Sequence, residues 1–264
     1  FRDVAGLDLI EINFENDKGT FVHEPNPLVD ANLQQTIDAV VEHDCNLGIC
    51  FDGDADRCMV VDERGTIVGC DLITAWLAPK FLAHEKDGGS IVFDLRSSHA
   101  VAKSVESAGG SSVRSRVGHV FMKQAMAEHD APFGGELSGH FYFRDNFYAD
   151  SGAMAFAAVV SAIATSSKTM SEQIAPHRSF CQSGEINFET PDKDAAMASL
   201  VENYPDAKVD RLDGVTVECD GWWCNVRASN TEPLLRLNLE SSSPEQVLKY
   251  VEEVSALLGT RVDH

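Results

Sequence analysis

The sequence predicts an α/β protein whose C-terminal part is a separate α+β unit. Along most of the chain, short apolar runs typical of strands alternate with longer segments in which apolar residues recur at helical spacing. Near the C-terminus several strands follow one another between two helices, which is typical of an α+β domain. At 264 residues the chain exceeds the usual size of one domain. We therefore expect more than one domain and place three units, at residues 1–66, 67–178 and 179–264.

The first unit is predicted to contain a strand, a helix and two further strands. The alternating residues 8–14 predict the first strand, and two short apolar runs, 47–51 and 58–61, predict the others. Between them lies a helix whose apolar face consists of Leu33, Ile37, Val40 and Val41. Because strand, helix and strand at this spacing are typical of α/β units, we expect a mostly parallel sheet.

The second unit is predicted to repeat this alternation. The expected strands lie at 91–95, 112–117 and 141–143, and the expected helices at 72–81, 100–108, 119–129 and 151–164. Pro79 lies inside the first of these helices and is expected to interrupt or kink it. A glycine-rich loop at 133–140 precedes the last strand.

The third unit follows a linker that we place around Pro176. Its expected strands lie at 185–189, 215–219, 222–227 and 234–239, with a helix at 192–203. A second helix is expected to begin with Ser243 as its N-cap and Gln246 at the third helical position, as in a capping box. The expected core face of this last helix consists of Leu248, Val251, Val254, Leu257 and Leu258.

The composition argues against several classes of protein. The formal net charge of −21 and the pI of about 4.6 disfavour a nucleic-acid or anionic-membrane partner. With such a charge, an anionic ligand would require a locally basic site. No run of about 18 apolar residues occurs, so we expect no membrane-spanning segment. The seven cysteines include no C-x-x-C pair, which favours buried thiols in a reducing cytoplasm.

An acidic loop stands between two predicted strands of the first unit. It reads Asp-Gly-Asp-Ala-Asp-Arg at 52–57, so the carboxylates of Asp52, Asp54 and Asp56 occupy alternate positions. A tight loop can direct such alternate side chains to one point. Three oxygen donors without a thiolate or an imidazole suit Mg²⁺, Mn²⁺ or Ca²⁺ better than zinc.

Two other interpretations of the acidic loop are open. An EF-hand would place Glu63 at the twelfth loop position, but Arg57 then occupies the sixth position, where glycine is needed, and the flanks are not helical. The loop could also be an acidic surface turn. Three neighbouring carboxylates between apolar strands repel one another, however, unless a cation offsets their charge.

Two further loops carry groups that suit a phosphorylated sugar. Residues 227–233 (Arg-Ala-Ser-Asn-Thr-Glu-Pro) combine a guanidinium with hydroxyl, amide and backbone donors, a set that suits a phosphate. Residues 134–140 (Gly-Gly-Glu-Leu-Ser-Gly-His) offer Glu136 and Ser138 to vicinal hydroxyls, and the glycines let the backbone approach a ligand. A polar hairpin turn and a glycine-rich hairpin are the alternatives for the two loops.

Two single residues are candidate site residues only because they accompany these motifs. His119 follows Gly118 at an expected helix start, where backbone N–H groups favour an anion. Arg96 stands at the end of the 91–95 strand. Neither residue indicates a site by itself.

Taken together, these stretches resemble the α-D-phosphohexomutases, the phosphomannomutase/phosphoglucomutase family. Residues 52–57 resemble its metal loop, residues 135–140 its sugar-specificity loop and residues 227–231 its phosphate-binding loop. The three loops occur in the family's order, and the likeness spans nearly the whole chain. Gly118-His119 and Asp94-Leu95-Arg96 also match, although Arg96 stands where some members have Lys. The sugar loop and residues 143–152 are most similar to bacterial phosphomannomutases.

The resemblance implies a four-domain architecture of which this chain is the C-terminal portion. Residues 1–66 would be the end of a mixed-sheet α/β second domain, followed by a complete third domain of the same type and an α+β fourth domain. The first domain, which carries the phosphoserine loop, would be missing. The nearest local echo of that loop is Ser98-His99, but Ala100 follows instead of Asn-Pro, so we do not assign it as the nucleophile.

The resemblance also implies a reaction and a role for each motif. The family moves a phosphoryl group between O1 and O6 of a hexose, here mannose and/or glucose, through a phosphoserine and a hexose 1,6-bisphosphate. Mg²⁺ would be held by Asp52, Asp54 and Asp56. The catalytic residues would be Arg57, His119 and His140, and the substrate would be bound by Arg96, Gly135, Glu136, Ser138, Arg227, Ser229, Asn230 and Thr231.

A different class of function is also open. Without the phosphoserine domain, the chain could be a non-catalytic module that binds a phosphosugar or a metal. A Ser-His-Asn-Pro loop upstream would favour the enzyme, whereas a native start near Phe1 would favour the module. We expect no turnover from this chain alone.

Overall fold

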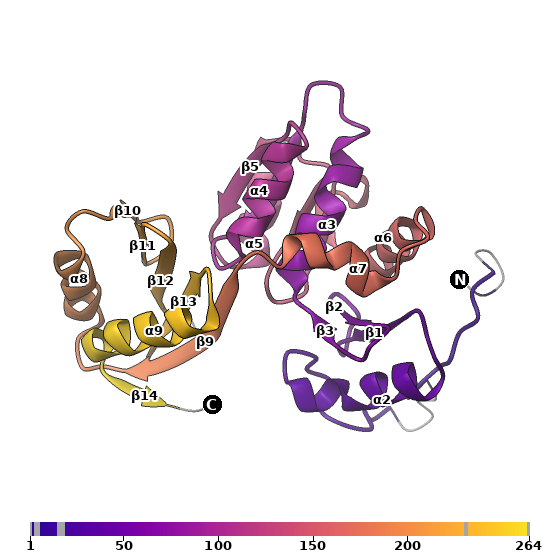
Figure 1. The fold of residues 1–264 in the computed structure, drawn as a ribbon, viewed down its shortest axis with the longest axis horizontal. Helices are drawn as coiled ribbons and strands as arrows, with labels where there is room; N and C mark the ends of the chain where they lie inside the picture. Colours follow the sequence, from indigo (N-terminus) through magenta and orange to yellow (C-terminus); the bar gives the residue numbers. More distant parts are fainter. Residues whose placement is uncertain (1, 3–5, 15–18, 230–231, 263–264) are drawn as a thin grey trace.

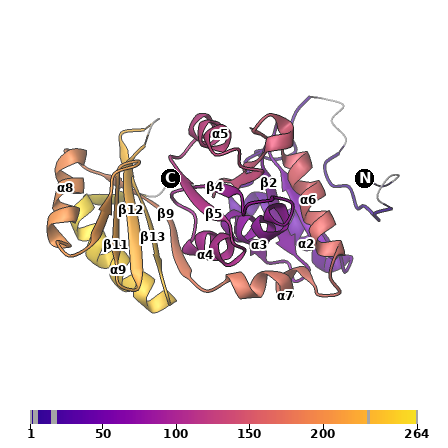
Figure 2. The same ribbon diagram turned by 90° about the horizontal axis from the view of Figure 1, so that it is seen from above.

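The computed structural model describes residues 2, 6–14, 19–229 and 232–262. The C-terminal unit, orange to yellow, lies at one end of the molecule and the indigo first unit at the other, with the second unit between them (Figures 1 and 2). None of the helices in the described part of the chain combines the length and the apolar character that crossing a bilayer requires.

The first unit is an antiparallel sheet that packs on a helix. Its elements are η1 (Asp30–Leu33), α2 (Gln34–Glu42), β1 (Leu47–Phe51), β2 (Cys58–Asp62) and β3 (Ile67–Val68). The sheet has the order β1-β2-β3, and both pairs of strands are antiparallel. Our prediction of a mostly parallel sheet is therefore wrong here. Residues 52–57 alone join β1 to β2, whereas a parallel crossover needs a dozen residues or more.

The predicted strand at 8–14 is also wrong. These residues form no strand, and the apolar side chains of Ile10, Ile12 and Phe14 are exposed. An alternating pattern forms a strand only where a neighbouring strand accepts its hydrogen bonds. None of the sheets in the described part of the chain includes such a neighbour for this segment.

The second unit is a five-stranded mixed sheet with helices on both faces, and its predicted strands and helices are confirmed within a few residues at each end. Its main elements are α3 (Cys70–Leu82), β4 (Ser90–Asp94), α4 (His99–Ser107), β5 (Ser111–Ser115), α5 (His119–Glu128), β6 (Phe133–Gly135), β7 (Phe141–Phe143), β8 (Ala149–Asp150) and α6 (Gly152–Ala164). The strand order is β5-β4-β6-β7-β8, with β4 parallel to β5 and β6. Three short elements follow or join these, namely η2 (Arg144–Asn146), α7 (Met170–Ile174) and η3 (Ala175–His177).

Helix α3 continues through Pro79 to Leu82, so the expected interruption is absent. Proline has no N–H to donate to the carbonyl of Ala75, four residues earlier. The hydroxyl of Ser104 on α4 donates to that carbonyl at 2.6 Å instead. A side chain from the neighbouring helix thus satisfies the acceptor that the proline leaves open.

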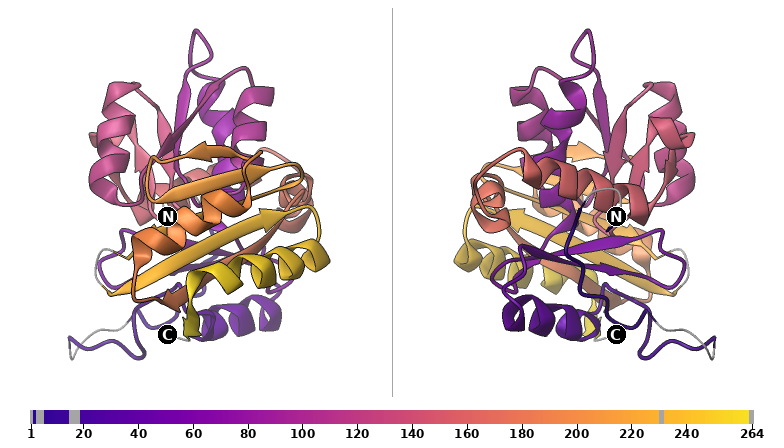
Figure 3. Two further views of the ribbon diagram at one scale, coloured as in Figure 1. Left: turned by 90° about the vertical axis from the view of Figure 1, so that its left-hand side faces the viewer. Right: turned by 90° about the vertical axis from the view of Figure 1, so that its right-hand side faces the viewer.

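The third unit is a six-stranded antiparallel sheet with two helices on one face. Its elements are β9 (Cys181–Glu189), α8 (Lys193–Asn203), β10 (Lys208–Asp210), β11 (Val215–Cys219), β12 (Trp222–Ala228), β13 (Leu234–Ser241), α9 (Pro244–Leu258) and β14 (Thr260–Val262). The strand order is β10-β11-β12-β13-β9-β14. Helices α8 and α9 cover the face that is turned away from the second unit (Figures 2 and 3). Pro176, where we expected a linker, lies in η3 just before β9.

The start of α9 and its core face are confirmed, except at Leu248. The hydroxyl of Ser243 accepts the N–H of Gln246, whereas the Gln246 side chain accepts the hydroxyls of Ser241 and Ser242 rather than completing a capping box. The predicted residues Val254 and Leu258 are buried, and Val251 and Leu257 pack against the same core. Leu248 is 71% exposed, so its placement in the core face was wrong, and Val247 is buried in its stead.

The molecule has two main hydrophobic cores, although we expected three units. One contiguous cluster includes Val60 of the first unit together with Trp76 and Phe133 of the second, so these two units share a core. The third unit has a core of its own, beneath α8 and α9. A small cluster around Met122 packs α5 against the other face of the second unit's sheet.

Candidate active site

The acidic loop is a tight connection whose arginine is held by its own first aspartate. Arg57 Nε donates to Asp52 Oδ2 at 2.6 Å, and the Arg57 backbone N–H donates to Asp52 Oδ1 at 3.1 Å. Arg57 Nη1 donates to Asn26 Oδ1 at 3.2 Å. These contacts fix the guanidinium on the same side of the loop as the carboxylates.

The three aspartates of this loop fit a hard divalent cation. One oxygen atom from each of Asp52, Asp54 and Asp56 can be chosen so that all lie within 4.8 Å of one another. Asp56 Oδ1 is buried and lacks a hydrogen-bond partner among the described residues. An all-oxygen set of this kind suits a hard cation such as Mg²⁺, Mn²⁺ or Ca²⁺.

The pKa shifts of two aspartates in this loop also favour a bound cation. Burial raises the pKa of Asp56, and the neighbouring Asp52 carboxylate raises it further. Burial also acts to raise the pKa of Asp52, but the hydrogen bonds from Arg57 outweigh burial and lower that pKa. One carboxylate is thus stabilised as an anion at the expense of the other, a conflict that a divalent cation would relieve.

The acidic loop is tied by backbone bonds to the second unit. The Gly152 N–H at the start of α6 donates to the Ala55 carbonyl at 3.1 Å, and the Cys58 N–H donates to the Gly139 carbonyl at 3.0 Å. A Cβ atom on Gly152 would lie 2.6 Å from the Ala55 oxygen. The residue at position 152 must therefore be glycine for α6 to approach the loop, a requirement that our sequence reasoning missed.

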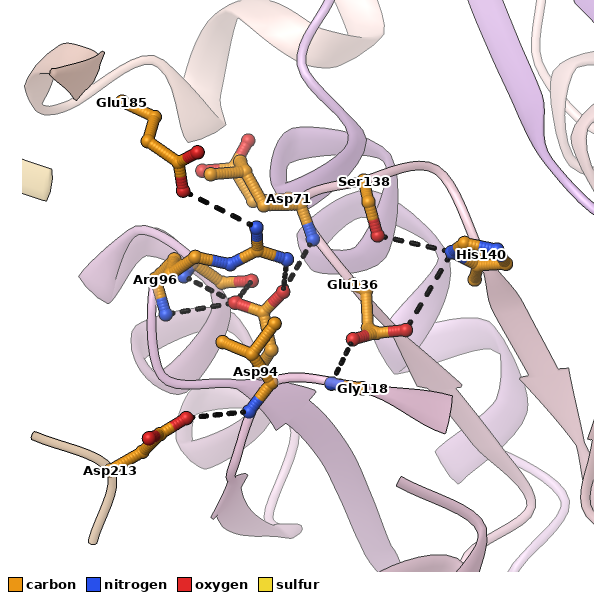
Figure 4. Close-up of polar contacts among 12 residues, drawn as sticks. Asp71, Asp94, Arg96, Gly118, Glu136, Ser138, His140, Glu185 and Asp213 are labelled. Atoms are coloured by element: carbon orange, nitrogen blue, oxygen red, sulfur yellow. Dashed lines mark hydrogen bonds and ion pairs between the residues drawn. The ribbon is translucent and has the colours of Figure 1, made fainter. Parts of the chain in front are cut away.

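The glycine-rich loop between β6 and β7 is built around Glu136. This buried carboxylate accepts the Gly118 N–H at 2.8 Å (Figure 4). It also accepts the Tyr142 hydroxyl at 2.6 Å. His119 is the first residue of α5, directly after Gly118, and is exposed. Gly135 lies in β6, where a Cβ atom would meet Thr74 Oγ1 of α3 at 2.1 Å, so glycine is required there for packing.

His140 lies between the glycine-rich loop and the acidic loop. Its Nδ1 is 3.0 Å from Ser138 Oγ and 3.7 Å from Glu136 Oε2 (Figure 4). Its Nε2 is 3.4 Å from Asp56 Oδ1 and 3.9 Å from Asp150 Oδ2. The structure therefore brings the predicted sugar loop and the predicted metal loop together at one imidazole.

Asp94 at the end of β4 is a positioning residue, which we named from the sequence within a matching stretch but gave no role. It accepts Arg96 Nη2 at 2.6 Å, and it also accepts the backbone N–H groups of Arg96, Ser97 and Leu137 (Figure 4). Burial acts to raise its pKa, but the charge and hydrogen bonds of Arg96 outweigh burial and lower it. A carboxylate two residues before a predicted ligand arginine was the signal that could have identified it.

A cluster of guanidinium groups lies where β12, β13 and β9 meet the second unit. Arg227 Nη2 donates to Glu185 Oε2 at 2.9 Å, and Arg236 Nη1 lies 3.2 Å from Glu185 Oε1. Arg96 Nη1 lies 3.9 Å from the same carboxylate (Figure 4). These three guanidinium groups are the candidate for the locally basic site that an anionic ligand would require in a chain of net charge −21, although Asp94, Glu185 and Glu232 pair with them in this structure.

The predicted phosphate loop is only partly described. The Ser229 N–H donates to the Leu234 carbonyl at 2.8 Å, and the Ser229 hydroxyl accepts the Glu232 N–H at 3.2 Å. Asn230 and Thr231 lie outside the described residues. Arg236, which our sequence reasoning missed, stands directly opposite Arg227 in the β12–β13 register, a relation that no local motif displays.

Known proteins match this chain over almost its full length. Family models match as phosphoglucomutase/phosphomannomutase, alpha/beta/alpha domain II over residues 2–65, alpha/beta/alpha domain III over residues 70–179, and C-terminal domain over residues 185–257. A phosphomannomutase of Methanocaldococcus jannaschii is 42% identical, covering 93% of this chain and 55% of the relative. A phosphomannomutase of Vibrio cholerae serotype O1 is 38% identical, covering 96% and 55%.

A solved structure supports the same assignment. The chain superposes on a phosphoglucomutase/phosphomannomutase family protein of Burkholderia thailandensis with a TM-score of 0.81 and 27% identity, covering 89% of this chain and 51% of the other. The chain spans about half the length of the curated relatives that it matches. The predicted resemblance is thereby confirmed: this chain belongs to the phosphoglucomutase/phosphomannomutase family and consists of its domains II to IV.

Proposed function

We propose that this chain provides the metal, sugar and phosphate sites of a hexose-phosphate mutase, acting on mannose and/or glucose phosphates. The observation that carries the proposal is a continuous series of contacts from Arg227 through Glu185, Arg96 and Asp94 to the sugar loop. Through His140 that loop contacts the acidic loop. Relatives named phosphomannomutase support this reaction class.

The acidic loop would hold the metal of this reaction. Asp52, Asp54 and Asp56 would bind Mg²⁺, which when bound offsets the negative charge of a transferring phosphoryl group. Arg57 supplies a second positive charge beside them, because Asp52 and Asn26 hold its guanidinium in place. A preorganised cation needs no reorganisation when charge develops in the transition state.

The sugar loop would bind the hydroxyls that do not react. Glu136 accepts one donor on each oxygen, and an ionised carboxylate has about four acceptor positions, so it can still accept sugar hydroxyls. Ser138 and His140 share a hydrogen bond and offer a second donor and acceptor beside it. His140 could hold or release a proton at Nε2, which faces Asp56, and exposed His119 would contribute a donor at the start of α5.

The distal phosphate would be anchored by the third unit. Arg227 supplies a buried guanidinium, and Arg96 adds one from the second unit. Ser229 would add a neutral donor, as would Asn230 and Thr231, which lie outside the described residues. The phosphoserine would come from outside the residues described here, and a hexose 1,6-bisphosphate would be the intermediate. We therefore expect this chain to bind a hexose phosphate without turning it over.

The compartment that we propose is the cytoplasm. All seven cysteines are free thiols in the structure. Burial raises the pKa of Cys58 to about 12, which keeps that thiol protonated and unreactive at neutral pH. Unpaired buried thiols fit a reducing environment.

The anchor is tested by calorimetric binding of mannose 6-phosphate to this chain in the presence of Mg²⁺. We expect Arg227→Ala to weaken binding by about tenfold or more, since it removes a charged hydrogen-bonded contact worth about 1.5 kcal/mol or more. Arg261→Ala is the matched control, because Arg261 is exposed and stands opposite Phe188, on the sheet face that carries the core. Equal affinities of the Arg227→Ala variant and the unsubstituted chain would contradict the proposed anchor.

A further inference from the structure

Glu185 contacts three guanidinium groups that come from two units of the chain. Its Oε2 atom lies 2.9 Å from Arg227 Nη2 and 3.9 Å from Arg96 Nη1, and its Oε1 atom lies 3.2 Å from Arg236 Nη1. Arg96 belongs to the second unit, whereas Arg227 and Arg236 belong to the third. One carboxylate therefore bridges positive charges on both sides of the junction between these units.

The three arginines would repel one another without this carboxylate. Arg227 and Arg236 are directly opposite in the antiparallel β12–β13 register, where like charges are destabilising. Burial lowers the pKa of Arg227, and the charges of Arg96 and Arg236 lower it further. Two of the arginines have a second carboxylate partner, because Arg96 pairs with Asp94 and Arg236 pairs with Glu232.

Some N–H donors of the arginine cluster have no hydrogen-bond acceptor among the described residues. The Nε atoms of Arg96, Arg227 and Arg236 are all buried and have no hydrogen-bond partner among the residues that the structure describes. The side chain of Arg227 is only 4% exposed, whereas that of Glu185 is 28% exposed. Buried donors without acceptors, beneath a carboxylate that reaches solvent, indicate that a second anion can add to or replace Glu185.

We propose that Glu185 is an internal counterion that occupies the place of the ligand phosphate and competes with it. This inference rests on the proposed function, because it assumes that the guanidinium cluster is the phosphate anchor. A phosphate offers more acceptor oxygens and more negative charge than a carboxylate, so it satisfies the arginines better once Glu185 moves toward solvent. When phosphate is absent, Glu185 keeps the three guanidinium groups together.

The position of Glu185 in the chain gives this exchange a second consequence. Glu185 lies on β9, the strand that leads from the second unit into the third (Figure 1). The pairing of β9 with β13 is irregular beside it, between Asn238 and Glu240. In the ligand-free chain Glu185 bridges Arg96 and Arg227, and bound phosphate takes over this bridge between the units.

The test is calorimetric titration of this chain with inorganic phosphate at low ionic strength. We expect Glu185→Gln to bind phosphate at least about fivefold more tightly, because the substitution keeps the shape of the side chain and removes its competing charge. This gain should shrink as added salt screens the charges, which a merely structural effect would not do. If Glu185→Gln folds poorly, Glu185→Ala is expected to show the same direction of change.

Glu189→Gln is the matched control. Glu189 is exposed on the same strand, four residues and roughly 13 Å farther along at about 3.3 Å per residue, a distance beyond the Debye length of about 8 Å at 0.15 M salt but within it at low ionic strength. We expect it to leave phosphate affinity unchanged at about 0.15 M salt and to raise it less than Glu185→Gln does at low ionic strength. An equal gain in this control would mean that net charge alone is responsible and would overturn the inference.

Arg227→Ala separates failure of this inference from failure of the proposed anchor. If Arg227→Ala loses phosphate binding but Glu185→Gln binds no more tightly than the unsubstituted chain, only the role of Glu185 is overturned. If Arg227→Ala binds phosphate as well as the unsubstituted chain does, the anchor itself is overturned. If neither the unsubstituted chain nor Glu185→Gln binds phosphate, both proposals fail.

Discussion

The two junctions between the units of this chain are held together by different forces. The first and second units share one hydrophobic core, which runs from Leu33 to Ile174. The second and third units meet through polar and aromatic contacts around His99, Arg96 and Glu240, among which Figure 4 shows the contact of Arg96 with Glu185. The third unit keeps its own core on the far side of its sheet.

The alternation of β12 explains this difference. Trp222, Cys224 and Val226 point toward the helices α8 and α9, so Trp223, Asn225 and Arg227 point to the other face. That second face meets the second unit, where the His99 ring stacks on Trp223 at 5.4 Å. The surface that touches the second unit is therefore the one that also carries Arg227, the arginine that we propose as the phosphate anchor.

The difference indicates which junction a bound ligand can rearrange more easily. Opening the first junction would expose apolar area at a cost of roughly 25 cal/mol per Å². Opening the second would exchange hydrogen bonds with the protein for hydrogen bonds with water, each at a net cost of about 1 kcal/mol. We infer that a phosphate bound by Arg96 and Arg227 can change the relation of the second and third units, while the first and second move together.

The largest expected effect comes from breaking the shared core. Phe133 is fully buried on β6 and stacks on Phe81 at a ring distance of 4.5 Å. Phe133→Ala should lower the free energy of unfolding by about 3–5 kcal/mol, because it removes a large side chain and leaves a cavity. Chemical denaturation measures the loss, and hydrogen exchange should show the first and second units opening together.

A surface phenylalanine of the same unit supplies the control for this prediction. Phe147 is 92% exposed, so Phe147→Ala should change stability by less than about 0.5 kcal/mol. The shared core would be in doubt if Phe133→Ala destabilised the second unit and left hydrogen exchange in β1 and β2 unaffected.

A smaller effect is expected at the polar junction. The buried Oε1 atom of Glu240 accepts the Trp223 indole N–H at 2.8 Å and the His99 backbone N–H at 3.0 Å. Glu240→Ala leaves both donors without an acceptor, so it should weaken the junction by about 1–3 kcal/mol. We expect the third unit then to unfold separately, before the other two, in a calorimetric scan.

Glu240→Gln keeps the accepting oxygen and serves as the matched variant. It should retain most of the coupling between the two units. A Glu240→Ala chain that melts in the same transitions as the unsubstituted chain would show that the junction does not depend on these hydrogen bonds.

The sequence predicted the order and type of most elements but not how the units associate. Helices α4, α5 and α8 were recognised because their periodicity and capping residues are local signals. The failures at 8–14 and in the sheet of the first unit both depended on a pairing partner, which no local pattern specifies. The short elements β8, α7, β10 and β14 were missed because two to five residues carry too little pattern.

The candidate site divides in the same way. Asp52, Glu136 and Arg227 could be predicted as site residues because each lies in a contiguous motif with a characteristic composition. Glu185 and Arg236 were missed because their contacts join segments far apart in the chain, whereas Asp94 was named only as part of a matching stretch and given no role. Charged residues on strands are common, and only the β-sheet register shows which of them meet.

The smallest expected effect is a pH dependence of opposite sign at the two junctions. Glu63, after β2, accepts the Ser171 N–H at 3.0 Å at the start of α7. Burial acts to raise the pKa of Glu63, but hydrogen bonds from Ser171 outweigh burial and lower this pKa to about 2. Burial raises the pKa of Glu240, and hydrogen bonds from Ser98, Trp223 and His99 offset that rise only in part.

These shifts give each carboxyl group its own pH window. The stability contributed by Glu63 is present above its unfolded pKa of 4.5 and is lost as the pH falls toward about 2. The contribution of Glu240 is complete below its unfolded pKa of 4.5 and is lost as the pH rises through its folded value. In urea unfolding between pH 7 and 3, we expect the advantage of the unsubstituted chain over Glu63→Gln to fall by about 1 kcal/mol on acidification, since a partly exposed group is screened. The free energy of unfolding of the unsubstituted chain, relative to that of Glu240→Gln, should rise as the pH falls from 7 to 3. If both differences changed in the same direction, the contrast between the two junctions would be contradicted.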